Sequence, residues 1–180
     1  MKIRNVLVAS LLVATAAAAT PAMADDKVAG SEVVIPDAPE GTGQIVFFRP
    51  GGAGFAMGCS VNENGEKISS LGSGRYFVLR TTPGRHEFSV KSEAKDVLAL
   101  EVEEGETQFA KCKIKMGILM GRPDLAPAKE DEFRKMNKVQ LVDADDMGPA
   151  PGALRPEEMM AAAVPAAEAE MEVEADAAAE

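Results

Sequence analysis

Residues 74–90 constrain the fold more strongly than any other stretch of the chain. Residues 76–79 (Tyr-Phe-Val-Leu) are strong β-formers in a row. The Pro83-Gly84 pair that follows is a turn signal, because Pro fixes φ at one turn position and Gly accepts a positive φ at the next. After the turn, apolar and polar residues alternate as far as Val90, which predicts one buried and one wet face. We therefore expect a hairpin of two strands, whose apolar face other strands must cover.

Further strand patterns surround this hairpin at the spacing of a sandwich or barrel, with turn signals about every eight to twelve residues. Residues 45–48 are continuously apolar, as in a strand covered on both faces. The other expected strands alternate, and they span residues 55–62, 66–71, 97–102 and 107–116, with a short helix at 131–138 and an edge strand at 139–142. The fold class predicted is all-β: a small antiparallel β-sandwich of about seven strands with one short C-terminal helix.

Residues 1–24 have the pattern of a secretory signal peptide. Two basic residues precede an apolar stretch at 6–19, which is shorter than the ~20 residues that a membrane span needs. Ala22 and Ala24 are the small residues that a signal peptidase reads, so cleavage is expected before Asp25. An uncleaved anchor is the alternative, and we expect no stable membrane span after cleavage.

The remaining chain divides by composition into a linker at 25–42, a β-domain at 43–143 and an acidic tail at 144–180. The tail holds ten acids and one Arg, so it carries −9 of the net charge of −10. Its Ala-, Pro- and Glu-rich composition predicts disorder with transient helix. A short edge strand at 32–35 is possible within the linker. The absence of a net basic domain argues against nucleic acid as a partner.

Cys59 and Cys112 both lie among alternating apolar residues, so both are expected to face the core. Export would place them in an oxidising compartment, where two cysteines allow a single intramolecular bridge. We predict a disulfide between them. Two buried thiols that merely pack, or a redox-active pair, are the alternatives.

His86 is the only histidine, and it sits at an apolar position beside the Pro83-Gly84 turn. A packed, hydrogen-bonded structural role is expected, because catalysis would need a nucleophile and an orienting acid as well. Ten methionines invite a soft-metal hypothesis, but they form no tight cluster. No cofactor and no metal site are therefore expected.

A candidate partner surface follows from the strand at 107–116 and its end. Lys111, Lys113 and Lys115 share one face of that strand. They form either a solvated face that protects an edge strand against aggregation or a docking site for an anionic partner. The protein's own tail could be such a partner. The apolar residues Ile118, Leu119 and Met120 follow, either buried or as an exposed contact.

Several motifs together resemble the bacterial domain of unknown function 2846 family of small exported or lipid-anchored β-proteins. They are Gly43-Gln44-Ile45-Val46-Phe47-Phe48-Arg49-Pro50, Val61-Asn62-Glu63-Asn64-Gly65-Glu66-Lys67, Gly74-Arg75-Tyr76-Phe77, Pro83-Gly84-Arg85-His86, Glu104-Gly105-Glu106-Thr107 and Met116-Gly117-Ile118-Leu119-Met120-Gly121-Arg122-Pro123. The Tyr and Pro-Gly-x-His portion is also similar to PEGA-type surface β-sandwich domains. The resemblance implies a small β-sandwich in the cell envelope and no reaction. The chain lacks the lipid-modified Cys of many relatives, which favours a soluble periplasmic or secreted protein.

The function expected from the sequence is therefore a non-catalytic binding or structural role in the periplasm, with an envelope protein or cell-wall component as partner. A weak hydrolase, or a metal or redox factor that uses His86 or the cysteine pair, is the alternative.

Overall fold

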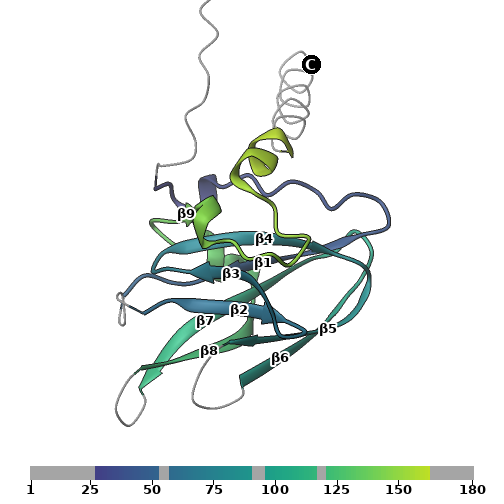
Figure 1. The fold of residues 1–180 in the computed structure, drawn as a ribbon. Coiled ribbons are helices and arrows are strands. Elements are labelled where there is room, and N and C mark those ends of the chain that lie inside the picture. Colours follow the sequence, from purple (N-terminus) through teal and green to yellow (C-terminus); the bar gives the residue numbers. More distant parts are fainter. Residues whose placement is uncertain (1–26, 53–56, 91–95, 117–120, 163–180) are drawn as a thin grey trace, which may run out of the picture.

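The computed structural model describes residues 27–52, 57–90, 96–116 and 121–162, which form two β-sheets packed face to face (Figure 1). The first sheet has the strand order β8-β7-β1-β4-β9 and the second has the order β3-β2-β5-β6. The strands are β1 (Gly43–Phe48), β2 (Cys59–Glu63), β3 (Glu66–Leu71), β4 (Arg75–Thr81), β5 (Gly84–Val90), β6 (Asp96–Val102), β7 (Thr107–Met116), β8 (Gly121–Ala128) and β9 (Gln140–Leu141). Short helices accompany them: η1 (Gly30–Glu32), α1 (Glu130–Arg134) and η2 (Ala144–Asp146), and residues 156–162 are helical as well. The all-β class with a short helix is confirmed.

The first sheet is mixed, which corrects the expectation of a purely antiparallel sandwich. β1 pairs antiparallel with β4 but parallel with β7, and β4 pairs parallel with β9. A parallel pair needs a long crossover between its strands. The chain between β1 and β7 supplies it by building the whole second sheet on the way.

The central hairpin expected at residues 74–90 is wrong. β4 pairs with β1 and β9, whereas β5 pairs with β2 and β6 in the other sheet. The Pro83-Gly84 turn, with Gly84 at φ +134°, therefore carries the chain from one sheet to the other. The predicted alternation in β5 is correct, because Phe88 and Val90 are buried.

β8 is a strand that the sequence analysis missed, because Gly and Pro, here Gly121 and Pro123, commonly mark the end of a strand. It pairs with β7 over its whole length. Pro123 and Pro127 have no N–H to donate, which is tolerated because β8 is an edge strand and such positions can face the free edge.

The inner faces of the two sheets share one core. Phe47 of β1 stacks on Phe77 of β4 with ring centroids 5.1 Å apart, and it meets Phe88 of β5 edge-on at 5.0 Å. Both cysteines lie in this inner core.

The outer face of the first sheet carries a second apolar cluster, which we call the outer cluster. Its strand members are Val46, Phe48, Tyr76, Val78 and Phe109, and its cover consists of Val33, Phe133, Val139, Leu154 and Met159. In Figure 1 the N-terminal and C-terminal segments lie together above β4 and β1.

The segment expected to be a linker is part of this cover. Val28 pairs with Val139 through two backbone hydrogen bonds of 3.0 and 2.7 Å, and Val33 is buried. The short strand expected at 32–35 is absent there, since η1 ends at Glu32 and no strand includes residues 33–35.

The first half of the expected disordered tail is also folded. Residues 147–154, which we call the strap, pair with Ser69 of β3 and then with Leu79 of β4. Gly148 N–H donates to the Ile68 carbonyl at 2.7 Å, and the Arg80 N–H donates to Gly152 at 2.8 Å. The strap therefore closes one side of the sandwich, and the helical residues 156–162 continue onto the outer cluster through Met159. Residues 163–180 lie outside the described residues.

Candidate functional site

The cysteine pair forms the predicted disulfide between β2 and β7. The Cα atoms of Cys59 and Cys112 are 6.6 Å apart, and neither residue is exposed to solvent. Because β2 and β7 belong to different sheets, the bond joins the two layers covalently through the inner core.

The bridge has a structural rather than a reactive setting. It closes a chain segment with a sequence separation of 53, for which loop-closure entropy gives about 4 kcal/mol. Thiol–disulfide exchange requires that an attacking thiolate reach one of the sulfurs. Both sulfurs are enclosed by core side chains such as Phe47 and Leu71, so the folded domain shields them.

His86 holds the crossover between the sheets. From β5, its Nδ1 lies 2.6 Å from Glu63 Oε1 at the end of β2, and its Nε2 lies 2.8 Å from the Thr82 carbonyl oxygen. The ring also stacks on Phe88, with centroids 6.1 Å apart. Both ring nitrogens thus face oxygen atoms that can accept a hydrogen bond.

Thr81, His86 and Glu63 bring together the residue types of a catalytic triad, but not its geometry. Thr81 Oγ1 is 3.3 Å from Nδ1 and 3.2 Å from Nε2 of His86. Because Thr81 Oγ1 is nearly equidistant from the two ring nitrogens, it does not lie along the lone pair of either nitrogen. A hydrogen bond from the hydroxyl to the ring requires that direction. In addition, Nε2 already contacts the Thr82 carbonyl oxygen. The arrangement does not activate the hydroxyl as a nucleophile, and it fits a structural role for His86.

The three predicted lysines project from the outer side of the first sheet, beside the outer cluster. Lys111 pairs with Glu132 of α1, and Lys115 pairs with Asp124 of β8 at 2.6 Å. Lys113 is exposed and makes none of the ion pairs found among the described residues. The lysine row is therefore partly neutralised by acids of the same domain.

β8 adds a fourth cation that the sequence analysis missed. Arg122 lies directly opposite Lys115 in the β7–β8 register, and residues opposite one another in an antiparallel pair share a face. We call Lys111, Lys113, Lys115 and Arg122 the basic face. Recognising β8 as a strand would have revealed it.

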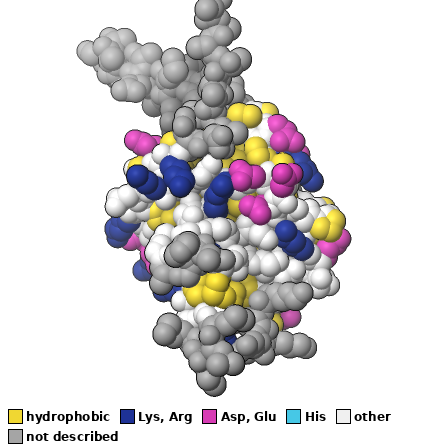
Figure 2. Space-filling model, turned by 60° about the vertical axis from the view of Figure 1, so that its left-hand side comes forward, with side chains coloured by type: hydrophobic (Ala, Val, Ile, Leu, Met, Phe, Trp, Pro, Cys, Tyr) yellow, Lys and Arg dark blue, Asp and Glu magenta, His cyan; other side chains and the backbone are white. Residues whose placement is uncertain are grey.

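The other predicted site residues lie outside the described residues. These are Ile118, Leu119 and Met120 of the partner surface, and Ala22, Ala24 and Asp25 of the cleavage site. On the side of the molecule in Figure 2, acidic and basic side chains intermingle rather than forming one large field of a single sign.

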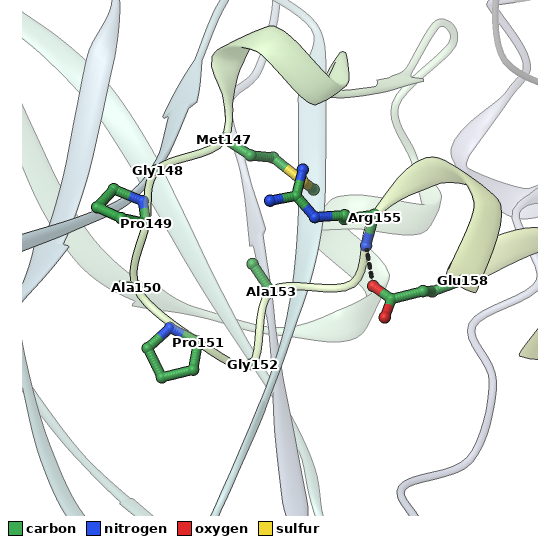
Figure 3. A pocket seen from close by; sticks show the side chains of 9 residues that line it. All are labelled: Met147, Gly148, Pro149, Ala150, Pro151, Gly152, Ala153, Arg155 and Glu158. Carbon is green, nitrogen blue, oxygen red and sulfur yellow. Dashed lines mark hydrogen bonds between the residues drawn. The ribbon is translucent and has the colours of Figure 1, made fainter.

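The strap forms a shallow hollow of about 210 Å³, which the sequence analysis did not anticipate. Figure 3 shows the Arg155 side chain reaching back across it toward Met147, while Glu158 accepts a hydrogen bond of 2.7 Å from the Arg155 N–H. That bond caps the helical residues 156–162, because the third residue of a helix commonly reaches back in this way. The hollow is lined by residues of the strap together with Arg155 and Glu158, and no His or Cys side chain is among them.

The part of the chain that the structure describes contains neither a cluster of metal ligands nor a membrane-spanning helix. No group of three or more His, Cys, Asp or Glu side chains could hold a metal ion there. Within the same part of the chain, no helix has the length and apolar character required to cross a membrane.

Comparison with known protein families gave a match. Residues 39–122 match the sequence model of a family described as "Protein of unknown function (DUF2846)". Neither a curated protein nor a solved structure matched.

Proposed function

We propose that this chain, which belongs to the DUF2846 family through its residues 39–122, is an exported, non-catalytic domain of the cell envelope. Its role is to bind an acidic, extended segment of another envelope protein through the basic face. The family supplies no activity, so the proposal is based on the chain's own geometry.

The buried disulfide is the observation that carries the proposal. Structural disulfides persist in oxidising compartments such as the periplasm and are rare in the cytosol. The Cys59–Cys112 bond spans the inner core, and the chain begins with the pattern of a secretory signal. The two features support the same compartment independently.

The basic face supports the choice of an acidic partner. Its four cations face two acids, Asp124 and Glu132, so its net charge is 4 − 2 = +2 in a chain whose formal charge is −10. Lys115 and Arg122 lie directly opposite one another. Like charges in this position are destabilising. Asp124 already offsets the charge of Lys115, and an anion that lies over the pair lowers the cost that remains.

The spacing of the lysines favours a polypeptide as the partner. Lysines at every second residue of β7 are separated by roughly 6.6–6.8 Å along the strand. Carboxylates at every second residue of an extended peptide have the same spacing. A regular row therefore matches an acidic strand better than it matches an irregular polymer.

Binding to poly-L-glutamate tests this assignment. We expect Lys113→Glu to weaken binding about fivefold to tenfold, because it removes one charge pair and adds a repulsion, each worth up to about 1 kcal/mol at an exposed site. Lys138→Glu is the matched control, since Lys138 is exposed beside β9, at the opposite edge of the same sheet.

Equal losses in the two variants would contradict the basic face as the binding surface. Stronger binding to anionic lipid vesicles or to purified cell-wall polymer than to poly-L-glutamate would contradict the choice of a protein partner.

Fractionation of cells tests export. The chain is expected in the periplasmic or secreted fraction with Asp25 as its first residue. Ala22→Asp with Ala24→Asp should retain the uncleaved chain at the membrane. A mature chain that still begins at Met1 in the cytosol would overturn the proposed localisation.

A further inference from the structure

The acidic residues near the end of the chain have the same period as the lysines of β7. Between residues 168 and 176, every second residue is an acid and the residues between them are Ala, Met or Val. The acids are Glu168, Glu170, Glu172, Glu174 and Asp176. In an extended chain, this period of two places all five carboxylates on one side. Residues 163–180 contain no Lys or Arg to offset them.

The basic face presents the complementary array. Lys111, Lys113 and Lys115 project from one side of β7 with the strand repeat of roughly 6.6–6.8 Å per two residues. Arg122 extends the array sideways onto β8. An extended acidic segment laid along β7 therefore brings carboxylates to Lys113 and Lys115, which are the exposed lysines of the row. The Lys111 side chain is only 11% exposed and already pairs with Glu132.

The chain leaves the described residues on the same side of the first sheet as the basic face. Met159, in the helical residues 156–162, is buried in the outer cluster together with Phe109 of β7. Phe109 and Lys111 are two residues apart on one strand, so their side chains share a face. The acidic segment does not have to pass around an edge of the sandwich to reach the lysines.

The length of the segment is sufficient. The 14 residues from 163 to 176 (176 − 163 + 1) span up to about 46–50 Å when fully extended. A strand of 10 residues such as β7 is about 33 Å long. The extended segment is therefore longer than β7.

We propose that residues 168–176 occupy the basic face of the same chain and compete there with an acidic partner. This inference rests on the proposed function, because it assigns a regulator to the binding surface named above. The segment is an internal copy of the ligand, and it leaves the face available only to a partner that binds more tightly.

The strength of the contact suits such a competitor. Each exposed ion pair contributes at most about 1 kcal/mol and is screened by salt. Tethering raises the effective concentration of the segment to the millimolar range. The segment thus occupies the face for only part of the time in the resting chain, and a partner with additional contacts can displace it.

Zero-length carbodiimide crosslinking of the mature chain tests the contact directly. Mass spectrometry should find Lys113 joined to Glu170, Glu172 or Glu174, in a yield that falls as the salt concentration rises. Lys138 is the internal control and should give few such products. If Lys113 and Lys138 crosslink equally to these glutamates, or if neither does, the inference is wrong.

Binding to poly-L-glutamate tests the competition. Deleting residues 163–180 should strengthen binding about threefold to tenfold, as expected when a weak tethered competitor is removed. A second variant, with the four glutamates 168, 170, 172 and 174 changed to Gln and Asp176→Asn, keeps the chain length and should give the same gain. Unchanged affinity in this neutralised chain would overturn the inference.

The two proposals fail in different ways. If Lys113→Glu weakens binding in the chain that lacks residues 163–180 but neutralising the acids changes nothing, the proposed function stands and this inference fails. If Lys113→Glu has no effect in that shortened chain, the proposed function fails, and the crosslinking result still decides whether the acidic segment lies on the basic face.

Discussion

The inner core and the outer cluster lie on opposite faces of β1 and β4, but they are built in different ways. The inner core joins strands of both sheets and contains the Cys59–Cys112 bond. The outer cluster is covered by α1 and by segments from both ends of the domain, which contribute Val33, Leu154 and Met159. One face is therefore closed by a second sheet and a covalent bond, and the other by short helices and irregular segments without one.

The difference shows what a continuously apolar strand requires. Residues 45–48 of β1 and 76–79 of β4 are apolar on both faces, and all of them are buried. A second sheet can cover only one of these faces. The segments before β1 and after β9 must therefore cover the other face, although their composition suggests a linker and a tail.

Truncation of the C-terminal segment should have the largest effect, because the strap packs against the inner core and the residues after it cover the outer cluster. Deleting residues 144–180 removes the strap and the buried side chains of Leu154 and Met159. We expect the free energy of unfolding to fall by about 5 kcal/mol, since each buried apolar side chain contributes roughly 1.5–3 kcal/mol. Urea denaturation measures this change. Deleting only residues 163–180 is the matched control and should leave the midpoint unchanged; a similar loss in both deletions would show that the strap adds nothing.

Removing the disulfide should have the next largest effect, and it acts on the inner core. Changing Cys59 and Cys112 to Ala should lower the free energy of unfolding by about 4 kcal/mol. The outer cluster should keep its packing around Phe133, so the ring-current shifts of its aromatic protons in NMR spectra should persist. Loss of those shifts below the unfolding transition would mean that the two clusters do not behave independently.

Tyr76 reports on the outer cluster at alkaline pH. Burial raises the pKa of its hydroxyl to about 12, against a smaller lowering by the charge of Arg134. Below pH 10 the hydroxyl is protonated in both folded and unfolded chains; above it, only the unfolded chain ionises. Stability should therefore fall as the pH rises from about 10 to about 12, by up to about 3 kcal/mol.

The chain has one Tyr and no Trp, so tyrosinate absorbance follows this single group. Tyr76→Phe should remove its share of the alkaline loss. An absorbance midpoint near pH 10 in the folded chain would place the hydroxyl in water instead.

Gly152→Ala should have the smallest effect of the four. Gly152 has φ +92°, and an added Cβ would lie 2.3 Å from the Arg80 carbonyl oxygen. We expect a loss of about 2 kcal/mol from strain and crowding together. Gly41→Ala is the control for strain alone, because Gly41 has φ +75° with open space around it, and it should cost about 1 kcal/mol. Equal costs in thermal denaturation would argue against close packing of the strap.

Patterns within a single strand were predictable from the sequence. The bounds of β3 and β7 agree with those expected, and the apolar alternation placed Cys59 and Cys112 in one core. Strand pairing was not predictable in this way, because a Pro-Gly turn can return the chain beside its own strand or carry it to another sheet. A usable signal was present: β1 and β4 are both continuously apolar and pair together, whereas β5 and β6 both alternate and pair in the other sheet.

Only part of the candidate site could be predicted from the sequence. The alternation in β7 predicted that its lysines 111, 113 and 115 share a face. Arg122 was missed because the neighbouring Pro123 suggested the end of a strand, whereas both residues belong to β8. The strap was missed for a related reason. Its Gly and Pro residues read as disorder, yet Gly148 is needed where an added Cβ would lie 1.9 Å from the Lys67 carbonyl oxygen. Such close approaches exist only in three dimensions.

The oxidation state of the cysteines in the cell decides whether the two sheets are joined covalently in an oxidising compartment. Cells that produce the chain are quenched with acid, free thiols are alkylated under denaturing conditions, and the chain is digested without reduction for mass spectrometry. The account predicts one linked peptide pair that contains Cys59 and Cys112, with almost no alkylated cysteine. Recovery of both cysteines as alkylated thiols in the mature chain would contradict it.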